Sequence, residues 1–200
     1  MENNFIEQDG STPLTNDELQ QLKIKSIITQ GELNEYEQLN INEALRWLVF
    51  QKVTIQKIMN FTFIKKLHKK MFGDVWVWSG EFRKTEKNIG VDPIFITTQL
   101  KNLLEDTLAQ INYKSYSPRE IAVRFHHRLV WIHPFVNGNG RHARVMTDLL
   151  LQAMNQEAFS WGQHGLTQYK DHTQNRKEYI QALREADKGI MESLIKFVDS

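Results

Sequence analysis

A histidine, a glycine-rich turn and two arginines lie within twelve residues of this chain, from His133 to Arg144. The residue before a proline is disfavoured in the helical region, and Pro134 itself has a fixed backbone, so His133 is expected where a helix ends. An imidazole has a pKa near neutrality and can remove a proton from a hydroxyl group. His133 is therefore a candidate general base.

The turn that follows, Asn137 to Gly140, contains two glycines. Glycine lets backbone N–H groups point toward an anion, and the helix expected after the turn would present the positive end of its dipole. Arg141 and Arg144 are three residues apart, so they share a helix face and offer fork-shaped donors to phosphate oxygens. Taken singly, these side chains are typical of caps and solvated charges. Their combination in one turn predicts a phosphate site.

Other sites built on similar residues fit the sequence less well. The turn matches neither the P-loop pattern nor the dinucleotide-binding pattern of glycines. A metal cluster is a further alternative, but no His-x-x-x-His pair with a nearby carboxylate supports it. Its ligands would be His126, His127, His133 and His142.

Composition predicts one domain, since two hundred residues with 40% hydrophobic content suffice for a substantial core. Lys and Arg number 25 against 24 acidic residues, so we expect no direct binding of nucleic acid. Cysteine is absent, which excludes disulfides and suits a reducing compartment. No apolar run is long enough to cross a bilayer and no basic signal-peptide start is seen, so the expected location is cytoplasmic, without a membrane partner.

Helices are expected to position these residues. Thr15 and Glu18 fit one capping box, and Thr29 and Glu32 fit another. Ser117, followed by a proline, is the expected cap of the helix that ends at His133. A short helix should follow Thr15, and apolar residues at three- and four-residue spacing predict further helices over about residues 33–48, 62–72, 98–111, 118–132, 141–153, 175–187 and 190–198.

The segment from Phe82 to Thr97 is the only one that is strand-like. It contains Gly90 and Pro93, which interrupt helices and favour a short hairpin. The sequence therefore predicts an all-α fold, a helical bundle with one short β-hairpin.

The motif from His133 to Arg144 resembles the signature of the Fic family, His-Pro-Phe-x-Asp/Glu-Gly-Asn-Gly-Arg-x-x-Arg, at every fixed position except Asn137. The similarity extends through residues 76–83, 125–128 and 179–183. More narrowly, the chain resembles the Fic-like subgroup called mobile mystery protein B, which also tends to have asparagine at that place. The resemblance implies a Fic-like helical bundle over residues 32–200 and an N-terminal extension, residues 1–31, that is a candidate regulatory segment.

The resemblance also implies a Fic-type nucleotidyltransferase, a protein adenylyltransferase that moves AMP from ATP to a Ser, Thr or Tyr hydroxyl of a target protein (AMPylation). His133 would be the general base. The α-phosphate would be held by Gly138, Asn139 and Gly140, and the leaving pyrophosphate by Arg141 and Arg144. The hairpin would be the flap that aligns the backbone of the target. Its residues would be Thr85, Glu86, Lys87, Asn88, Ile89 and Gly90.

Asn137 stands where the family usually has a carboxylate that holds Mg²⁺. A neutral amide oxygen brings no charge, so the implied Mg²⁺ would bind less tightly. Two alternatives therefore stay open. The chain could be a degenerate Fic-like protein that binds a nucleotide or a partner without transfer, or a Fic-like enzyme that uses another nucleotide or phosphate donor.

Regulation and partners are also implied by the resemblance. Many family members carry an inhibitory glutamate that pairs with the second motif arginine, here Arg144. Residues 26–31 fit the spacing but place Gln30 at that position, so Glu32 is the candidate, against the plainer interpretation of a helix cap. The expected partners are ATP or another nucleotide, an unknown target protein and, by the subgroup resemblance, a helix-turn-helix protein.

Overall fold

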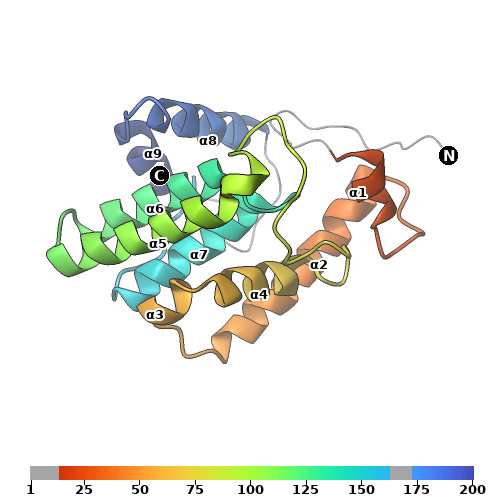
Figure 1. Cartoon of the computed structure of the whole chain (residues 1–200), viewed down its shortest axis with the longest axis horizontal. Helices are drawn as coiled ribbons and strands as arrows, with labels where there is room; N and C mark the ends of the chain where they lie inside the picture. Colours follow the sequence, from red (N-terminus) through yellow and green to blue (C-terminus); the bar gives the residue numbers. More distant parts are fainter. Residues whose placement is uncertain (1–13, 163–172) are drawn as a thin grey trace.

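The computed structural model describes residues 14–162 and 173–200. Two long helices, α6 and α7, lie side by side through the middle of the molecule (Figure 1). Helix α5 packs on α6, helices α2 and α4 pack together beside α7, and α8 pairs with α9 at the opposite end. In chain order the helices are α1 (Asn16–Gln20), α2 (Gln30–Val49), α3 (Ile55–Ile58), α4 (Phe61–Phe72), the 3-10 turn η1 (Pro93–Phe95), α5 (Ile96–Tyr113), α6 (Pro118–Ile132), α7 (Asn139–Ala153), α8 (Thr173–Ala186) and α9 (Glu192–Val198).

The predicted all-α class is confirmed, because residues 14–162 and 173–200 contain helices and loops but no strand. The predicted helices recur with shifts of a few residues at their ends. Helix α3 was not predicted, because a single turn is too short for apolar periodicity to show. None of the helices in these two ranges has the length and apolar character that crossing a bilayer requires.

Capping residues set where the helices start. The Thr15 side chain accepts the Glu18 N–H and the Glu18 carboxylate accepts the Thr15 N–H, as predicted for a capping box, and Thr29 and Glu32 repeat this arrangement at α2. Ser117 caps α6 by accepting the Glu120 N–H at 3.2 Å. Each such cap stabilises its helix by about 1 kcal/mol.

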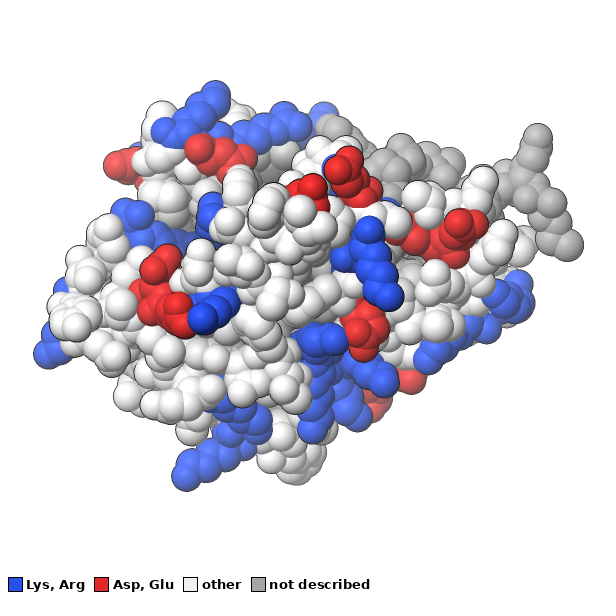
Figure 2. Space-filling view, viewed as in Figure 1, with Lys and Arg blue, Asp and Glu red and all other residues white. Residues whose placement is uncertain are grey.

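Charged side chains of both signs are spread over the face of the molecule shown in Figure 2. Two of the surface ion pairs, Arg46 with Glu43 and Lys101 with Glu105, join side chains that are more than 60% exposed. Such pairs contribute little to stability. With 25 basic and 24 acidic residues in the whole chain, recognition of a phosphate must depend on the local arrangement of a site.

The segment between α4 and α5 is a loop, so the predicted hairpin is not formed. Phe82 makes an isolated antiparallel bridge with Phe135, and the chain then bends toward η1. The physical reason is Arg83, whose buried guanidinium donates to the backbone oxygens of Thr85, at 2.9 Å, and of Val91. In a hairpin, these carbonyls would accept hydrogen bonds from the opposite strand. Here they accept hydrogen bonds from the Arg83 side chain instead.

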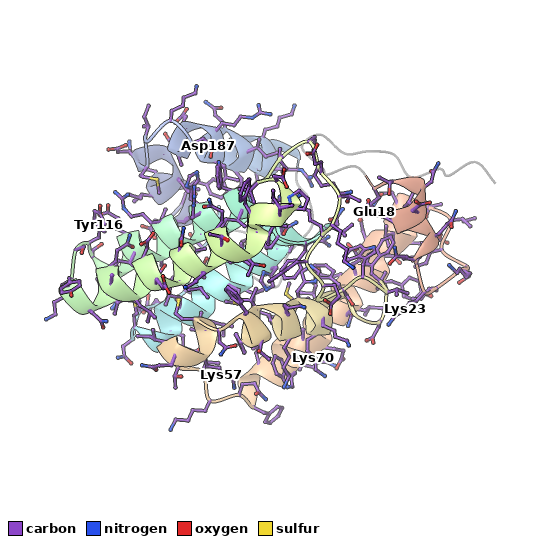
Figure 3. All side chains as sticks on the ribbon, viewed as in Figure 1. Glu18, Lys23, Lys57, Lys70, Tyr116 and Asp187 are labelled. Atoms are coloured by element: carbon purple, nitrogen blue, oxygen red, sulfur yellow. The ribbon has the colours of Figure 1, made fainter. Side chains whose placement is uncertain are left out.

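Helix α1 lies against this loop, as the label of Glu18 in Figure 3 shows. The Thr85 hydroxyl donates to Glu18 Oε1 at 3.0 Å, and Lys87 forms an ion pair with the same carboxylate. The side chains of Lys87 and Glu18 are only 3% and 7% exposed. A segment of the predicted N-terminal extension is thus tied to the loop by a buried charge pair.

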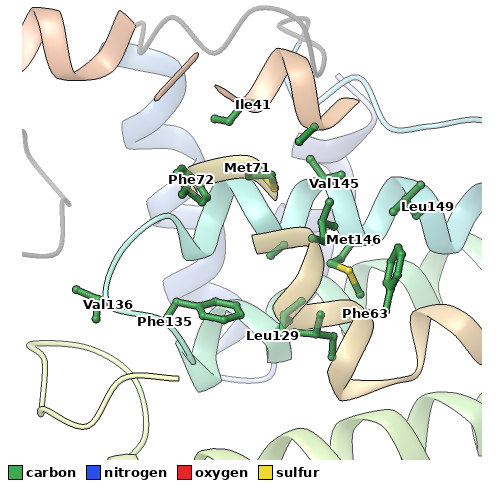
Figure 4. Packing of buried hydrophobic residues seen from close by; sticks show 14 of the residues in the cluster. Ile41, Phe63, Met71, Phe72, Leu129, Phe135, Val136, Val145, Met146 and Leu149 are labelled. Carbon is green, nitrogen blue, oxygen red and sulfur yellow. The ribbon is translucent and has the colours of Figure 1, made fainter. Parts of the chain in front are cut away.

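Two hydrophobic cores meet along α6 and α7. The first lies among α2, α4, α5, α6 and α7, and Figure 4 shows Phe135 entering it beside Leu129. The second joins the other face of α6 and α7 to the segments after α7, through Trp161, Tyr179 and Phe197. Burying each large side chain stabilises the fold by about 2–3 kcal/mol. The loop between α6 and α7 is anchored in the first core by Phe135 and Val136.

Candidate active site

His133 is the first residue after α6, with φ 53° and ψ 59°. This left-handed conformation is uncommon for a residue with a side chain and costs roughly 1–2 kcal/mol. Neighbouring bonds hold it in place, because Arg83 Nε donates to the His133 oxygen at 2.7 Å and the Arg83 N–H donates to the Pro134 oxygen at 2.9 Å. The strained position is thus determined by its surroundings, as often occurs at functional sites.

The loop between α4 and α5 covers His133. Gly90, at φ +98°, approaches so closely that a Cβ there would lie 2.6 Å from the His133 Cβ. His133 is only 5% exposed. Burial, reinforced by the charge of Arg83, lowers the pKa of His133 to about 3. The imidazole is therefore neutral at pH 7, which is the form that a general base requires.

The turn before α7 is closed by Asn139. Its Oδ1 accepts the Phe135 N–H at 2.9 Å and its Nδ2 donates to the Phe135 oxygen at 2.8 Å, so both polar atoms of this buried side chain are used within the loop. Gly138 has φ 76°, and a Cβ there would lie 2.5 Å from the Phe72 ring. A phosphate at this turn would meet backbone N–H groups of the first turn of α7, at and near Gly140, rather than the Asn139 amide.

Asn137 lies between His133 and this turn. Its Oδ1 accepts the Gly138 N–H at 2.5 Å, and its backbone oxygen lies 3.0 Å from His68 Nε2. His68 Nδ1 accepts the Gly80 N–H at 3.0 Å, so the proton is on Nε2 and His68 donates to Asn137. The buried imidazole of His68 thus supports the loop.

The residues present do not form a Mg²⁺ site of their own. The one oxygen that Asn137 offers is neutral and is bonded to Gly138, whereas Mg²⁺ sites usually include carboxylates. Among residues 14–162 and 173–200, no three His, Cys, Asp or Glu side chains gather to hold a metal ion. The histidines of the alternative metal cluster have separate hydrogen-bond partners; these are Tyr179 for His126, Asp187 for His127 and the Ile64 oxygen for His142.

The two arginines have different surroundings. Arg141 Nη1 donates to Glu37 Oε2 at 2.6 Å, and its guanidinium lies over the Phe72 ring. Glu37 is buried on α2 and also accepts from Trp76 Nε1 at 2.6 Å. Arg144, by contrast, lies against aromatic rings. Glu37 was not among the predicted site residues, although it occupies an inward position of the apolar stripe on α2, where a charge is unusual.

Glu32 caps α2. Its carboxylate accepts the backbone N–H groups of Ile28 and Thr29, both at 3.0 Å, and these bonds lower its pKa. Among the described residues, none of its contacts involves Arg144. The predicted flap residues lie in the loop over His133. Thr85 and Lys87 contact Glu18, whereas Glu86, Asn88, Ile89 and Gly90 are exposed.

Comparison with known proteins identifies one family. Residues 58–151 match the model of the Fic/DOC family. The chain is 28% identical over 181 residues to a protein adenylyltransferase Fic of Nematostella vectensis, and 28% identical over 140 residues to the protein adenylyltransferase fic-1 of Caenorhabditis elegans. These alignments cover 87% and 68% of this chain but only 38% and 25% of the relatives. The chain thus spans less than half of their length.

Solved structures share the fold. A Fic-1 fragment from C. elegans is 25% identical with a TM-score of 0.64, covering 80% of this chain and 46% of that one. The N-terminal Fic domain of an effector protein from Bartonella sp. AR 15-3 is 17% identical with a TM-score of 0.69, covering 98% and 89%. BepC from Bartonella tribocorum, solved with bound AMPPNP, is 19% identical with a TM-score of 0.65, covering 96% and 94%.

Proposed function

Because this chain belongs to the Fic/DOC family, we propose that it is a protein adenylyltransferase, which transfers AMP from ATP to a Ser, Thr or Tyr hydroxyl of a target protein. The observation that carries the proposal is a neutral His133 placed directly before the N-terminal turn of α7 and its two arginines. The relatives named adenylyltransferases support the reaction, and the AMPPNP bound to BepC supports a nucleoside triphosphate as donor.

In the proposed reaction, His133 removes the proton of the target hydroxyl as that oxygen attacks the α-phosphorus. A new P–O bond forms, the bond from the α-phosphorus to the bridging oxygen breaks, and pyrophosphate leaves. Backbone N–H groups of the first turn of α7 stabilise the charge on the α-phosphate. Because the residues present form no Mg²⁺ site, the protein's share of neutralising the pyrophosphate falls to Arg141 and Arg144.

The loop over His133 must shift for this reaction. With His133 only 5% exposed beneath Gly90, a target hydroxyl cannot reach the imidazole while the loop keeps its position. The exposed residues of the loop, Glu86, Asn88 and Ile89, are then the first to meet an approaching target chain. In this proposal the loop takes the role of the predicted flap without strand pairing within it.

The test is transfer of label from α-labelled ATP to proteins of a cell lysate, followed by mass spectrometry of the modified residues. We expect His133→Ala and His133→Asn to abolish labelling while ATP still binds. Asparagine tolerates the left-handed conformation at this position, so it guards against loss of the fold. His127→Ala, in the helix that ends just before His133, is the matched control. Labelling that persists in both His133 variants would remove the base assignment.

A second candidate function is nucleotide binding without transfer. It is favoured by the Arg141–Glu37 pair, because a carboxylate already occupies donors that a phosphate would use, and by the neutral Asn137. The same experiment separates the two functions when it is run with GTP, CTP and UTP as well as ATP. Nucleotide binding in calorimetry, with no His133-dependent label from any of the four, would establish the second function.

A further inference from the structure

The guanidinium of Arg144 lies in an aromatic cage, formed by Trp161 and Tyr179 and supported by His126. The guanidinium carbon is 4.6 Å from the centroid of the Tyr179 ring and 5.7 Å from that of Trp161. We infer that Tyr179, held by His126, is a positioning residue that fixes Arg144 for binding the polyphosphate of the donor. The inference rests on the proposed function of the site, and it assigns a role to Tyr179, which lies 46 positions beyond His133 and 35 positions beyond Arg144.

Hydrogen bonds below the cage fix the orientation of Tyr179. The Thr147 hydroxyl donates its only proton to the Ala143 oxygen at 2.7 Å, so toward His126 Nδ1, 3.3 Å away, it can only accept. His126 therefore carries its proton on Nδ1. Burial, reinforced by the charge of Arg144, lowers the pKa of His126 to about 3, so the ring is neutral and Nε2 is an acceptor.

The Tyr179 hydroxyl, 2.8 Å from His126 Nε2, must then be the donor of that bond. Its oxygen keeps lone pairs for the guanidinium. Burial raises the pKa of Tyr179, and the charge and hydrogen bond of Arg144 act against that rise. A continuous chain of bonds thus runs from the backbone of α7 through Thr147, His126 and Tyr179 back to Arg144 on the same helix.

The cage also reaches the turn that would hold the α-phosphate. A Cβ placed on Gly140 would lie 3.9 Å from the Tyr179 hydroxyl, which is ordinary van der Waals contact. Tyr179 is in turn packed in the second core, with its ring centroid 5.5 Å from that of Phe197. The segments after α7 therefore determine where Arg144 can point.

Aromatic rings suit this purpose better than a carboxylate does. Arg141 is oriented by Glu37, whose negative charge competes with phosphate for the same donors. The faces of Tyr179 and Trp161 attract a guanidinium without cancelling its charge. Arg144 is consequently oriented by aromatic rings rather than by a carboxylate that occupies its donors. Of the two arginines, Arg144 is therefore the better suited to bind the polyphosphate of a nucleotide.

The test compares affinities for ATP, AMP and inorganic tripolyphosphate by calorimetry. Tyr179→Leu removes the ring, and we expect it to weaken ATP and tripolyphosphate about tenfold while AMP changes less than about twofold. Tyr179→Phe keeps the ring but loses the hydrogen bonds of the hydroxyl to His126 and Arg144, so it should restore only part of the loss; it also covers the case in which Tyr179→Leu does not fold. Leu194→Ala is the matched control, since it loosens the same core and lies outside the cage.

An equal loss for AMP would overturn the inference, and so would a Leu194→Ala variant that loses ATP affinity as Tyr179→Leu does. An unaltered chain that binds no tripolyphosphate would also overturn it. Failure of the proposed function looks different. If the chain transfers no label but binds tripolyphosphate in a Tyr179-dependent way, the role of Tyr179 stands and the proposed transfer reaction is wrong. If transfer depends on His133 but not on Tyr179, the transfer reaction stands and the role of Tyr179 is wrong.

Discussion

Asn137 is the residue of the motif loop whose replacement is most informative. Asn137→Asp adds a charge where a neutral oxygen now accepts the Gly138 N–H. Because an ionised oxygen binds a divalent cation far better than an amide does, we expect Mg²⁺ to bind roughly tenfold or more tightly and AMP transfer to rise. Mg²⁺ titrations of transfer from labelled ATP measure both effects.

Asn88→Asp is the control for this prediction, since it adds the same charge at an exposed position of the loop over His133. If no metal binds, the new carboxylate at position 137 repels the phosphates and activity falls. Lower transfer at saturating Mg²⁺ would mean that Asn137 suits a different donor or no transfer at all.

Residues of the site could be predicted from the sequence where they are neighbours in the chain. His133, Gly138 and Arg144 lie within twelve consecutive residues, so their types and spacing sufficed. Glu37 is 104 residues from Arg141, and only the fold brings them together. Tyr179 was part of the resemblance, but nothing local shows that its ring faces Arg144, because that depends on how the second core packs.

The loop between α4 and α5 is the element on which access to His133 depends. Glu18→Gln in α1 removes the charge that pairs with the buried Lys87. A buried cation that loses its partner is costly, so we expect the loop to open more often. Amide hydrogen exchange of residues 82–91 should become about tenfold faster or more.

Asp17→Asn is the matched control for this variant, because Asp17 is the exposed neighbour in the same helix. It should leave exchange in the loop unchanged. Equal protection in Glu18→Gln and the unaltered chain would indicate that Arg83 alone holds the loop over His133.

Periodicity predicted the long helices and their capping predicted their starts, but the hairpin prediction failed. Gly90 and Pro93 interrupt helices, and they occur in irregular loops as well as in hairpins, so they could not distinguish a loop from a hairpin. What decides between them is Arg83, whose donors occupy carbonyls of the loop. A single buried arginine outweighs the local turn signals, and only the packed structure shows that it is buried.

Buried histidines make the whole molecule sensitive to acid. Burial lowers the pKa of His68 well below its usual value and those of three more, His126, His133 and His142, to about 3. Unfolding exposes these rings to a pKa near 6.5, so below that pH the unfolded chain binds more protons and stability falls as pH drops toward 3. Burial raises the pKa of Asp148 to about 7. Between about pH 4 and 7 the folded chain therefore binds more protons at Asp148 than the unfolded chain does, and this group makes the fold more stable as pH drops.

On unfolding, His126, His133 and His142 take up about three protons and Asp148 releases one, which leaves about two, or roughly 3 kcal/mol for each pH unit below about 6; His68 acts in the same direction as the other histidines. We expect the urea midpoint to drop steeply between pH 6 and pH 5. Asp148→Asn should steepen the drop by about one proton, since it removes the opposing group. Equal midpoints at pH 7 and pH 5 would contradict the neutral state of these histidines.

The second core has a consequence for the time at which the site is completed. The N–H groups of Ser160 and Trp161 donate to the Val198 oxygen, so the loop that carries Trp161 is fixed by α9. A ribosome adding about 5–20 residues per second needs roughly 3–10 seconds to pass from Arg144 to Val198. During that interval a nascent chain holds His133 and both arginines but no cage, and its capacity to orient a nucleotide arrives only as synthesis reaches α9.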